Sequence, residues 1–188
     1  MLSQGGQTAP RGARGQRAAR GFSLMELMIT LAVLAILLSL AVPSFTSVIN
    51  ANRLTAQANE LVADLQLART EAIRRNQRVT VCPSLDNATC AAGGSWANRI
   101  VIAPVGAGNE VIRVSASRPP LQLSGGVTSI VFRPDGIARD AAGLLVSTTL
   151  TVCLPTTTPQ QNVRQVALQS GARVSTSSSV HSTPGACP

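Results

Sequence analysis

The spacing of apolar residues changes twice along this chain. From Leu27 to Val42 they form a nearly continuous run, and no charged residue occurs between Leu27 and Asn52. As an α-helix, the run would be about 24 Å long, and about 30 Å if residues 22–24 join it. Because the hydrocarbon core of a bilayer is about 30 Å thick, this segment predicts a helix that enters or crosses a membrane.

Beyond Pro43 the apolar residues occupy one side of a second predicted helix. They recur at intervals of four and three residues, a spacing that places them in a single stripe. The stripe comprises Leu54, Ala58, Leu61, Leu65, Ala68 and Ala72. The charged residues lie largely off the stripe, and we expect the helix to end near Asn76. Proline has no N–H to donate, so Pro43 should kink the helix or melt it locally.

From Arg78 onward, short β-branched runs separated by Pro, Gly or Asn predict strands. They are 78–83, 98–104, 110–115, 128–134, 144–155 and 162–169. Residues 116–126 and Asp135-Gly136 have the composition of turns, and Trp96 is expected to anchor a core or loop. The polar segment 175–188 predicts a flexible tail held only by Cys187. The predicted fold class is α+β, with a long N-terminal helix packed on a small antiparallel sheet.

These patterns divide the chain into four parts. We expect a basic leader at 1–21, a hydrophobic helix at 22–43, an amphipathic helix at 44–77 and a β-rich domain at 78–188. The chain has a formal charge of +8 from 16 basic and 8 acidic residues. Four arginines lie in the leader, so a chain beginning at Phe22 would have 12 basic residues and a charge of +4. By the positive-inside rule the leader stays cytoplasmic and the β-rich domain lies outside.

The four cysteines, Cys82, Cys90, Cys153 and Cys187, all follow the hydrophobic helix. An even number on the exported side favours two disulfides. Three pairings are possible, and Cys82–Cys90 with Cys153–Cys187 is favoured because it closes the smallest loops. No metal site or cofactor is expected, since the sequence has no C-x-x-C motif and its single histidine, His181, lies in the polar tail.

Gly21-Phe22-Ser23-Leu24-Met25-Glu26, followed by Pro43, resembles the type III (prepilin) signal of type IV pilins and type II secretion pseudopilins. The resemblance implies that a prepilin peptidase cuts between Gly21 and Phe22 and methylates Phe22. Glu26 then becomes the fifth mature residue and Pro43 the twenty-second, as in the family pattern. In the low-dielectric core of a filament, Glu26 could pair with the amino group of Phe22 and favour docking in register.

Residues 51–84, and most specifically 68–82, resemble the GspH/FimT family of minor pilins and pseudopilins. The resemblance covers roughly residues 20–175. It implies a type IV pilin-like fold and a role at the tip of a type II secretion pseudopilus or a type IV pilus. It also implies four partners: other pilins or pseudopilins, the prepilin peptidase, an inner-membrane assembly platform and, before assembly, membrane lipid.

An alternative within the same family is a filament-tip subunit that binds DNA during natural transformation. The resemblance to that branch would imply a Gly-Arg-x-Arg turn, whereas this chain has Gly171-Ala172-Arg173-Val174. Arg164 and Arg173 remain as possible DNA contacts, but phosphate binding depends on clustered positive charge. The densest basic cluster, formed by Arg69, Arg74, Arg75 and Arg78, is expected to be a solvated helix end favoured by the helix dipole.

An enzymatic role has little support in the sequence. No G-x-S-x-G motif is present, and His181 has no acidic residue near it in the sequence. Asp135 is better explained as a turn residue than as a general base or calcium ligand. We therefore expect no catalytic residue in this chain, which would be the substrate of a peptidase and methyltransferase.

Overall fold

The computed structural model describes residues 21–169 and 171–188, with the side chains of residues 40–43 left out. Residues 1–20 of the basic leader predicted at 1–21 therefore lie outside the described residues. The described chain consists of one long helix, α1 (Leu24–Arg75), followed by short strands. It divides into two compact units, one ending at Ala41 and one running from Val42 to Pro188.

In the first unit, α1 exposes every side chain from residue 21 to residue 39. This part of the helix is long and apolar enough to cross a membrane, and none of its apolar window is buried. The helix is continuous through residue 43. Helical structure is therefore retained at Pro43, and of the two expected effects of this residue, local melting is wrong.

In the second unit, the predicted apolar stripe of α1 is confirmed, because all six of its residues are buried. The helix ends at Arg75, one residue before the predicted end. Asn76 has a positive φ of 51°, and Gln77 N donates to Ala72 O while Asn76 N donates to Ile73 O. This pair of hydrogen bonds is a Schellman motif, in which a residue able to adopt the left-handed conformation ends the helix.

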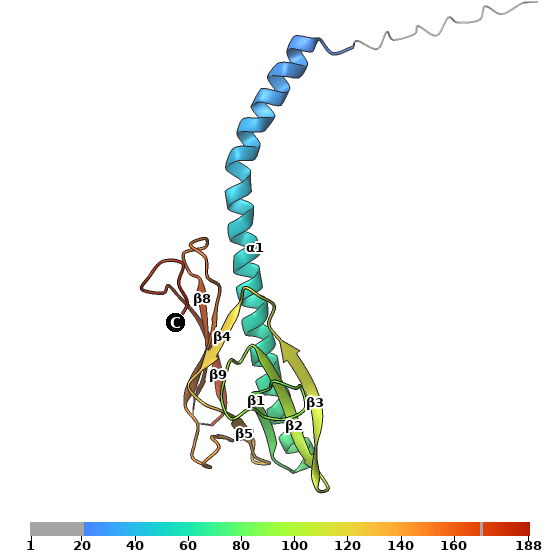
Figure 1. Cartoon of the computed structure of the whole chain (residues 1–188), viewed down its shortest axis with the longest axis vertical. Coiled ribbons are helices and arrows are strands. Elements are labelled where there is room, and N and C mark those ends of the chain that lie inside the picture. The colour runs from blue at the N-terminus through green and yellow to red at the C-terminus, as the bar shows by residue number, and fades with distance from the viewer. Residues whose placement is uncertain (1–20, 170) are drawn as a thin grey trace, which may run out of the picture. The chain divides into compact units, whose positions relative to one another are not determined.

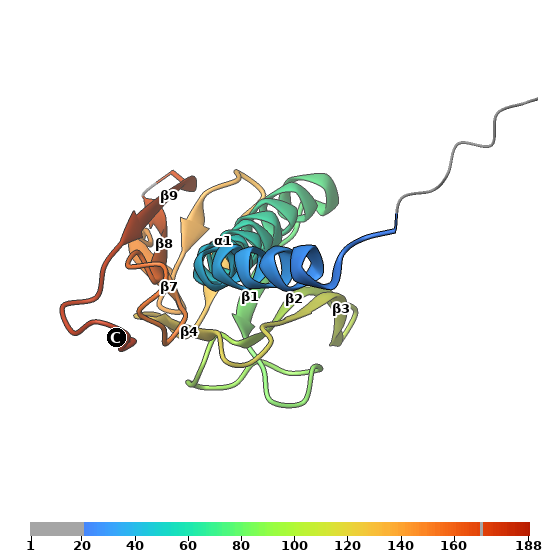
Figure 2. The same cartoon turned by 90° about the horizontal axis from the view of Figure 1, so that it is seen from above.

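Two antiparallel sheets lie beside this part of α1 (Figures 1 and 2). The five-stranded sheet has the order β3-β2-β1-β5-β6, and the four-stranded sheet has the order β4-β7-β8-β9. The strands of the first sheet are β1 (Val79–Pro83), β2 (Asn98–Val105), β3 (Gly108–Ala116), β5 (Ile130–Phe132) and β6 (Ala138–Arg139). Those of the second are β4 (Gln122–Gly125), β7 (Thr148–Cys153), β8 (Val163–Gln169) and β9 (Arg173–Ser179).

Both sheets share one hydrophobic core with α1. The core combines the helix stripe with Val81 and Val101 of the first sheet and Leu150 and Val166 of the second. Trp96 is fully buried in it and its Nε1 donates to Val127 O at 3.1 Å, as expected for a core anchor. Gly125 is required beside it, since a Cβ there would lie 2.4 Å from Leu150 Cδ2.

Three strands, β4, β6 and β9, lie outside the runs that the sequence patterns predicted. β4 lies within the segment expected to form turns, and β9 includes the first residues of the segment expected to be a flexible tail. The expectation of a tail was wrong for Ser175–Ser179. β9 is mostly exposed and polar, but its backbone pairs with β8 from Arg173 to Ser179. Backbone pairing requires no apolar side chains, so hydrophobic alternation does not detect such an edge strand.

Candidate assembly surface

The exposed half of α1 presents large apolar side chains over its whole circumference. Phe22 is 78% exposed and Leu34 is 50% exposed, and Met28, Leu31 and Leu38 are exposed to similar degrees. Burial of a Leu, Ile, Phe or Met side chain is worth about 1.5–3 kcal/mol. A stretch of this length is therefore not stable in water and requires lipid or other protein around it.

The predicted processing and assembly residues lie at the start of this surface. Gly21 and Phe22 precede the helix, Ser23 O accepts a hydrogen bond from Leu27 N, and Glu26 lies in the first turn. All of them are exposed. Ser23-x-x-Glu26 is also the spacing of a capping box, and a carboxylate in the first turn is stabilised by the helix dipole. Glu26 is therefore compatible with an isolated helix as well as with an assembly role.

A buried ionic network fastens the second half of α1 to the β2–β3 hairpin. Asp64 and Arg99 are both fully buried, and Arg99 Nε donates to Asp64 Oδ2 at 2.6 Å. Ser115 Oγ donates to Asp64 Oδ1 at 3.0 Å, and Arg113 Nε lies 3.0 Å from the same oxygen. Arg99 Nη2 lies 3.8 Å from Glu60 Oε2. Two carboxylates and two guanidinium groups thus neutralise one another.

No local sequence pattern specifically indicates this network. Asp64 occupies a polar position off the apolar stripe, and Arg99 lies in a strand that is otherwise apolar. Each resembles an ordinary solvated residue until the tertiary contact is known. A charged residue within a buried strand, as at Asn98-Arg99-Ile100, was the one available hint, since an isolated buried charge needs a partner.

The cysteines form the disulfides Cys82–Cys90 and Cys153–Cys187. This is the pairing that the shorter loops favour. The first closes a loop in which Asp86 accepts hydrogen bonds from the Thr89 hydroxyl, from Thr89 N and from Ala88 N. These donors, the Thr89 hydroxyl first, hold the pKa of the Asp86 carboxyl well below its usual range. The second disulfide joins the C-terminal segment to β7.

The basic cluster at the end of α1 is largely engaged within the protein. Arg74 and Arg75 both donate to Glu71, and Arg75 also pairs with Glu110 on β3. The bonds from Arg74 and then Arg75 lower the pKa of Glu71. The pKa of Arg75 is raised, first by Glu110 and then by Glu71. Within the described residues, these pairs leave less free positive charge than the sequence suggests.

The two possible DNA contacts do not form one patch. Arg164 of β8 pairs across the hairpin with Ser178, which is five residues from Arg173 along β9. At about 3.3 Å per residue, this places them about 17 Å apart. Arg164 Nη1 donates to the backbone oxygens of Gln161 and Val163, whereas Arg173 lines a small cavity with Arg69. The structure thus separates the residues that DNA binding would need together.

Asp135, which was considered as a general base or calcium ligand, has a structural role in a turn. Asp135 Oδ1 accepts a hydrogen bond from Ile137 N, and Gly136 has a φ of +73° in the same turn. The interpretation of Asp135-Gly136 as a turn is confirmed. Among the described residues, no group of His, Cys, Asp or Glu side chains is arranged to hold a metal ion.

Comparison with known families decides the identity of the chain. Residues 57–178 match the family model described as type II transport protein GspH. The chain belongs to the GspH family. Residues 16–42 also match the prokaryotic N-terminal methylation motif, which covers the exposed half of α1 and the residues before it. No curated protein matches the chain in sequence.

Solved structures agree with GspH-family membership at the level of the fold. The type IV minor pilin FimU of Pseudomonas aeruginosa is 18% identical, with a TM-score of 0.50 over 66% of this chain and 92% of that chain. The minor pseudopilin EpsH of the Vibrio cholerae type 2 secretion system is 14% identical, with a TM-score of 0.50 over 67% of this chain and 97% of that one. The predicted α+β, type IV pilin-like fold is confirmed.

Proposed function

We propose that this GspH-family chain is a minor subunit at the tip of a filament, either a type II secretion pseudopilus or a type IV pilus. The observation that carries the proposal is the exposed, largely apolar segment from Phe22 to residue 39, in a chain whose globular unit has a hydrophobic core of its own. The globular unit buries its core residues within itself, whereas the apolar residues of the exposed segment have no cover within the chain. Helices of other pilins or pseudopilins would cover this segment.

Processing and location follow from the same segment. A prepilin peptidase would cut between Gly21 and Phe22 and methylate the new N-terminus, a role that the match to the N-terminal methylation motif supports. Before assembly the helix would lie in the inner membrane, where an assembly platform could extract it. The globular unit would then be periplasmic, a compartment in which its two disulfides can form and persist.

Mass spectrometry of the mature N-terminus tests the processing step. The expected N-terminal residue is N-methylated Phe22, and a peptidase-deficient strain should retain residues 1–21. A mature chain beginning elsewhere would contradict the proposed cut. Deletion of the gene, followed by assays of secretion, twitching motility and transformation, would then assign the filament. Loss of secretion indicates a pseudopilus, and loss of twitching indicates a pilus. A defect in neither would overturn the proposed function.

A further inference from the structure

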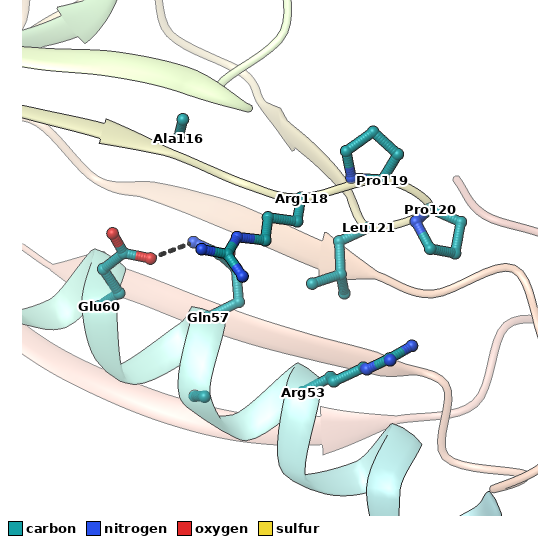
Figure 3. Close-up of a pocket in the computed structure, with 9 residues that line it drawn as sticks. Arg53, Gln57, Glu60, Ala116, Arg118, Pro119, Pro120 and Leu121 are labelled. Carbon is teal, nitrogen blue, oxygen red and sulfur yellow. Dashed lines mark hydrogen bonds between the residues drawn. The ribbon is translucent and has the colours of Figure 1, made fainter.

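A cavity of about 520 Å³ lies between α1 and the connection from β3 to β4. Arg53, Gln57 and Glu60 line it from the helix, and Arg118, Pro120 and Leu121 line it from the connection (Figure 3). Its volume falls within the range of ordinary ligand pockets, about 300–1,000 Å³. The cavity lies wholly within the globular unit and includes none of the residues assigned to processing or assembly.

The charge of this cavity is positive once internal pairs are counted. Glu60 accepts a hydrogen bond from Gln57 Nε2 at 2.7 Å and lies 3.8 Å from Arg99 Nη2. Because Arg99 and Arg113 together balance Glu60 and Asp64, the carboxylate in the lining is already compensated. The charges of Arg53 and Arg118 remain.

The side chain of neither remaining arginine forms a hydrogen bond or an ion pair within the described residues. Both are exposed. In Figure 3, Arg118 extends from the β3–β4 connection toward Gln57 and Glu60, and Arg53 extends from α1 away from them. Each arginine can donate charge-assisted hydrogen bonds to an anion in the cavity, and bonds of this kind are stronger than neutral ones. The geometry therefore favours an anionic ligand.

The rest of the lining favours a carboxylate on a peptide. Pro119, Pro120, Leu121 and Ala56 give the cavity an apolar wall, which suits an aliphatic side chain next to an acidic one. A nucleic-acid backbone would be better matched by a longer row of cations. The expected ligand is a short segment with Asp or Glu beside apolar residues.

The seven acidic side chains in the globular unit of a second copy of this chain already have partners. Four of its acids, Glu60, Asp64, Glu71 and Glu110, are in ion pairs. The other three, Asp86, Asp135 and Asp140, accept backbone hydrogen bonds that hold turns. A different polypeptide is therefore the better source of an unpaired acidic side chain.

We propose that the cavity between Arg53 and Arg118 binds an acidic, apolar-flanked segment of a neighbouring, non-identical protein. Only the identification of that neighbour as another filament subunit rests on the proposed function. Binding itself can be measured without a filament, so a negative result would remove this inference and leave the proposed function intact.

The test uses the full chain in detergent micelles and a fluorescent peptide, Ala-Leu-Glu-Val-Glu-Ala. Fluorescence anisotropy should show saturable binding that Arg53→Gln and Arg118→Gln each weaken about tenfold, because each removes a charge-assisted hydrogen bond. Arg78→Gln is the matched control, since Arg78 is exposed but does not line the cavity. It should leave binding unchanged, and a peptide with Gln in place of both Glu residues should not bind.

Four results would overturn the proposal. They are an absence of saturable binding, equal binding of the Gln peptide, equal weakening by Arg78→Gln, and binding of inorganic phosphate without binding of the acidic peptide. Self-association of the chain should also be measured by sedimentation. If Arg53→Gln abolishes a dimer, the cavity belongs to a second copy and the proposed partner is wrong.

Discussion

The two halves of α1 have opposite relations to their surroundings. From residue 21 to residue 39 every side chain is exposed, although nearly all are apolar. From Leu54 to Ala72 the apolar stripe is fully covered by the protein's own sheets, and even Asp64 is buried in a neutral network. The apolar stripe of one half of the helix is buried within the chain, and the apolar side chains of the other half are not. A substitution in the first half should therefore alter assembly, and one in the second half should alter folding.

Asp64→Asn should give the largest loss of folding stability. It leaves Arg99 buried without its closest counter-charge, and breaking a buried pair in this way costs about 3–5 kcal/mol. Chemical denaturation of the full chain in detergent measures the change. Glu110→Gln is the control, because its partner Arg75 lies nearer the surface and an exposed pair contributes about 0–1 kcal/mol. Equal effects of the two variants would contradict the importance of the network.

Replacement of Cys153 and Cys187 by serine should cost about 4 kcal/mol, since their disulfide joins residues 34 apart and longer loops lose more entropy. The same change at Cys82 and Cys90, which are 8 residues apart, should cost about 2.5 kcal/mol. Denaturation midpoints of the two double variants give the ranking. A larger loss at the shorter loop would show that loop entropy does not control the difference.

Two leucine substitutions, one in each half of α1, test the difference between the halves. Leu61→Ala removes a fully buried side chain and should cost about 3 kcal/mol of unfolding free energy. Leu34→Ala acts on a side chain that is 50% exposed and should change the stability of the globular unit by less than about 0.5 kcal/mol. Only Leu34→Ala should reduce the recovery of the chain in filaments without lowering its amount in the cell. Equal destabilisation would remove the distinction between the halves.

Asp86→Asn should have the smallest effect, confined to the loop closed by Cys82–Cys90. The pKa of Asp86 is lower in the folded protein, so its carboxylate stabilises the fold at pH values above the unfolded pKa of about 3.9. That contribution is lost as the pH falls from there toward the folded pKa. The variant should therefore be less stable than the wild type at pH 7 and approach it in stronger acid. A stability difference that does not change with pH would rule out this role.

The sequence predicts the elements with strong periodicity better than those without it. The helix stripe and the runs that became β1, β2, β5, β7 and β8 have apolar residues at spacings that the core buries. The run that became β3 was predicted from its β-branched residues, although most of this strand is exposed. β4 and β9 lack that pattern, because backbone pairing with β7 and β8 supplies their stability. At Pro43 the sequence suggested an interruption that the structure does not have. Local melting was one of the two effects expected of this proline, but the helix continues through it.

The candidate sites also divide into one with a local sequence pattern and others without such a pattern. Gly21, Phe22 and Glu26 form a contiguous motif, so the sequence could suggest a processing and assembly role for them. The ionic network and the cavity join residues of α1 to residues some 35–65 positions later. No local pattern links Arg53 to Arg118, or Asp64 to Arg99. Such contacts become visible only when the fold brings the hairpin and the β3–β4 connection against the helix.

The most direct test of the proposed assembly role compares Glu26→Ala with Thr30→Ala, a change about one helical turn further along the same exposed surface. Membrane and filament fractions are quantified for both variants and for the wild type. Glu26→Ala should reach the membrane in normal amounts but be depleted from filaments about tenfold, because a carboxylate that pairs with a neighbouring charge within a filament contributes to docking in register. Thr30→Ala should assemble normally. Unchanged incorporation of Glu26→Ala would contradict the assembly role of this surface residue.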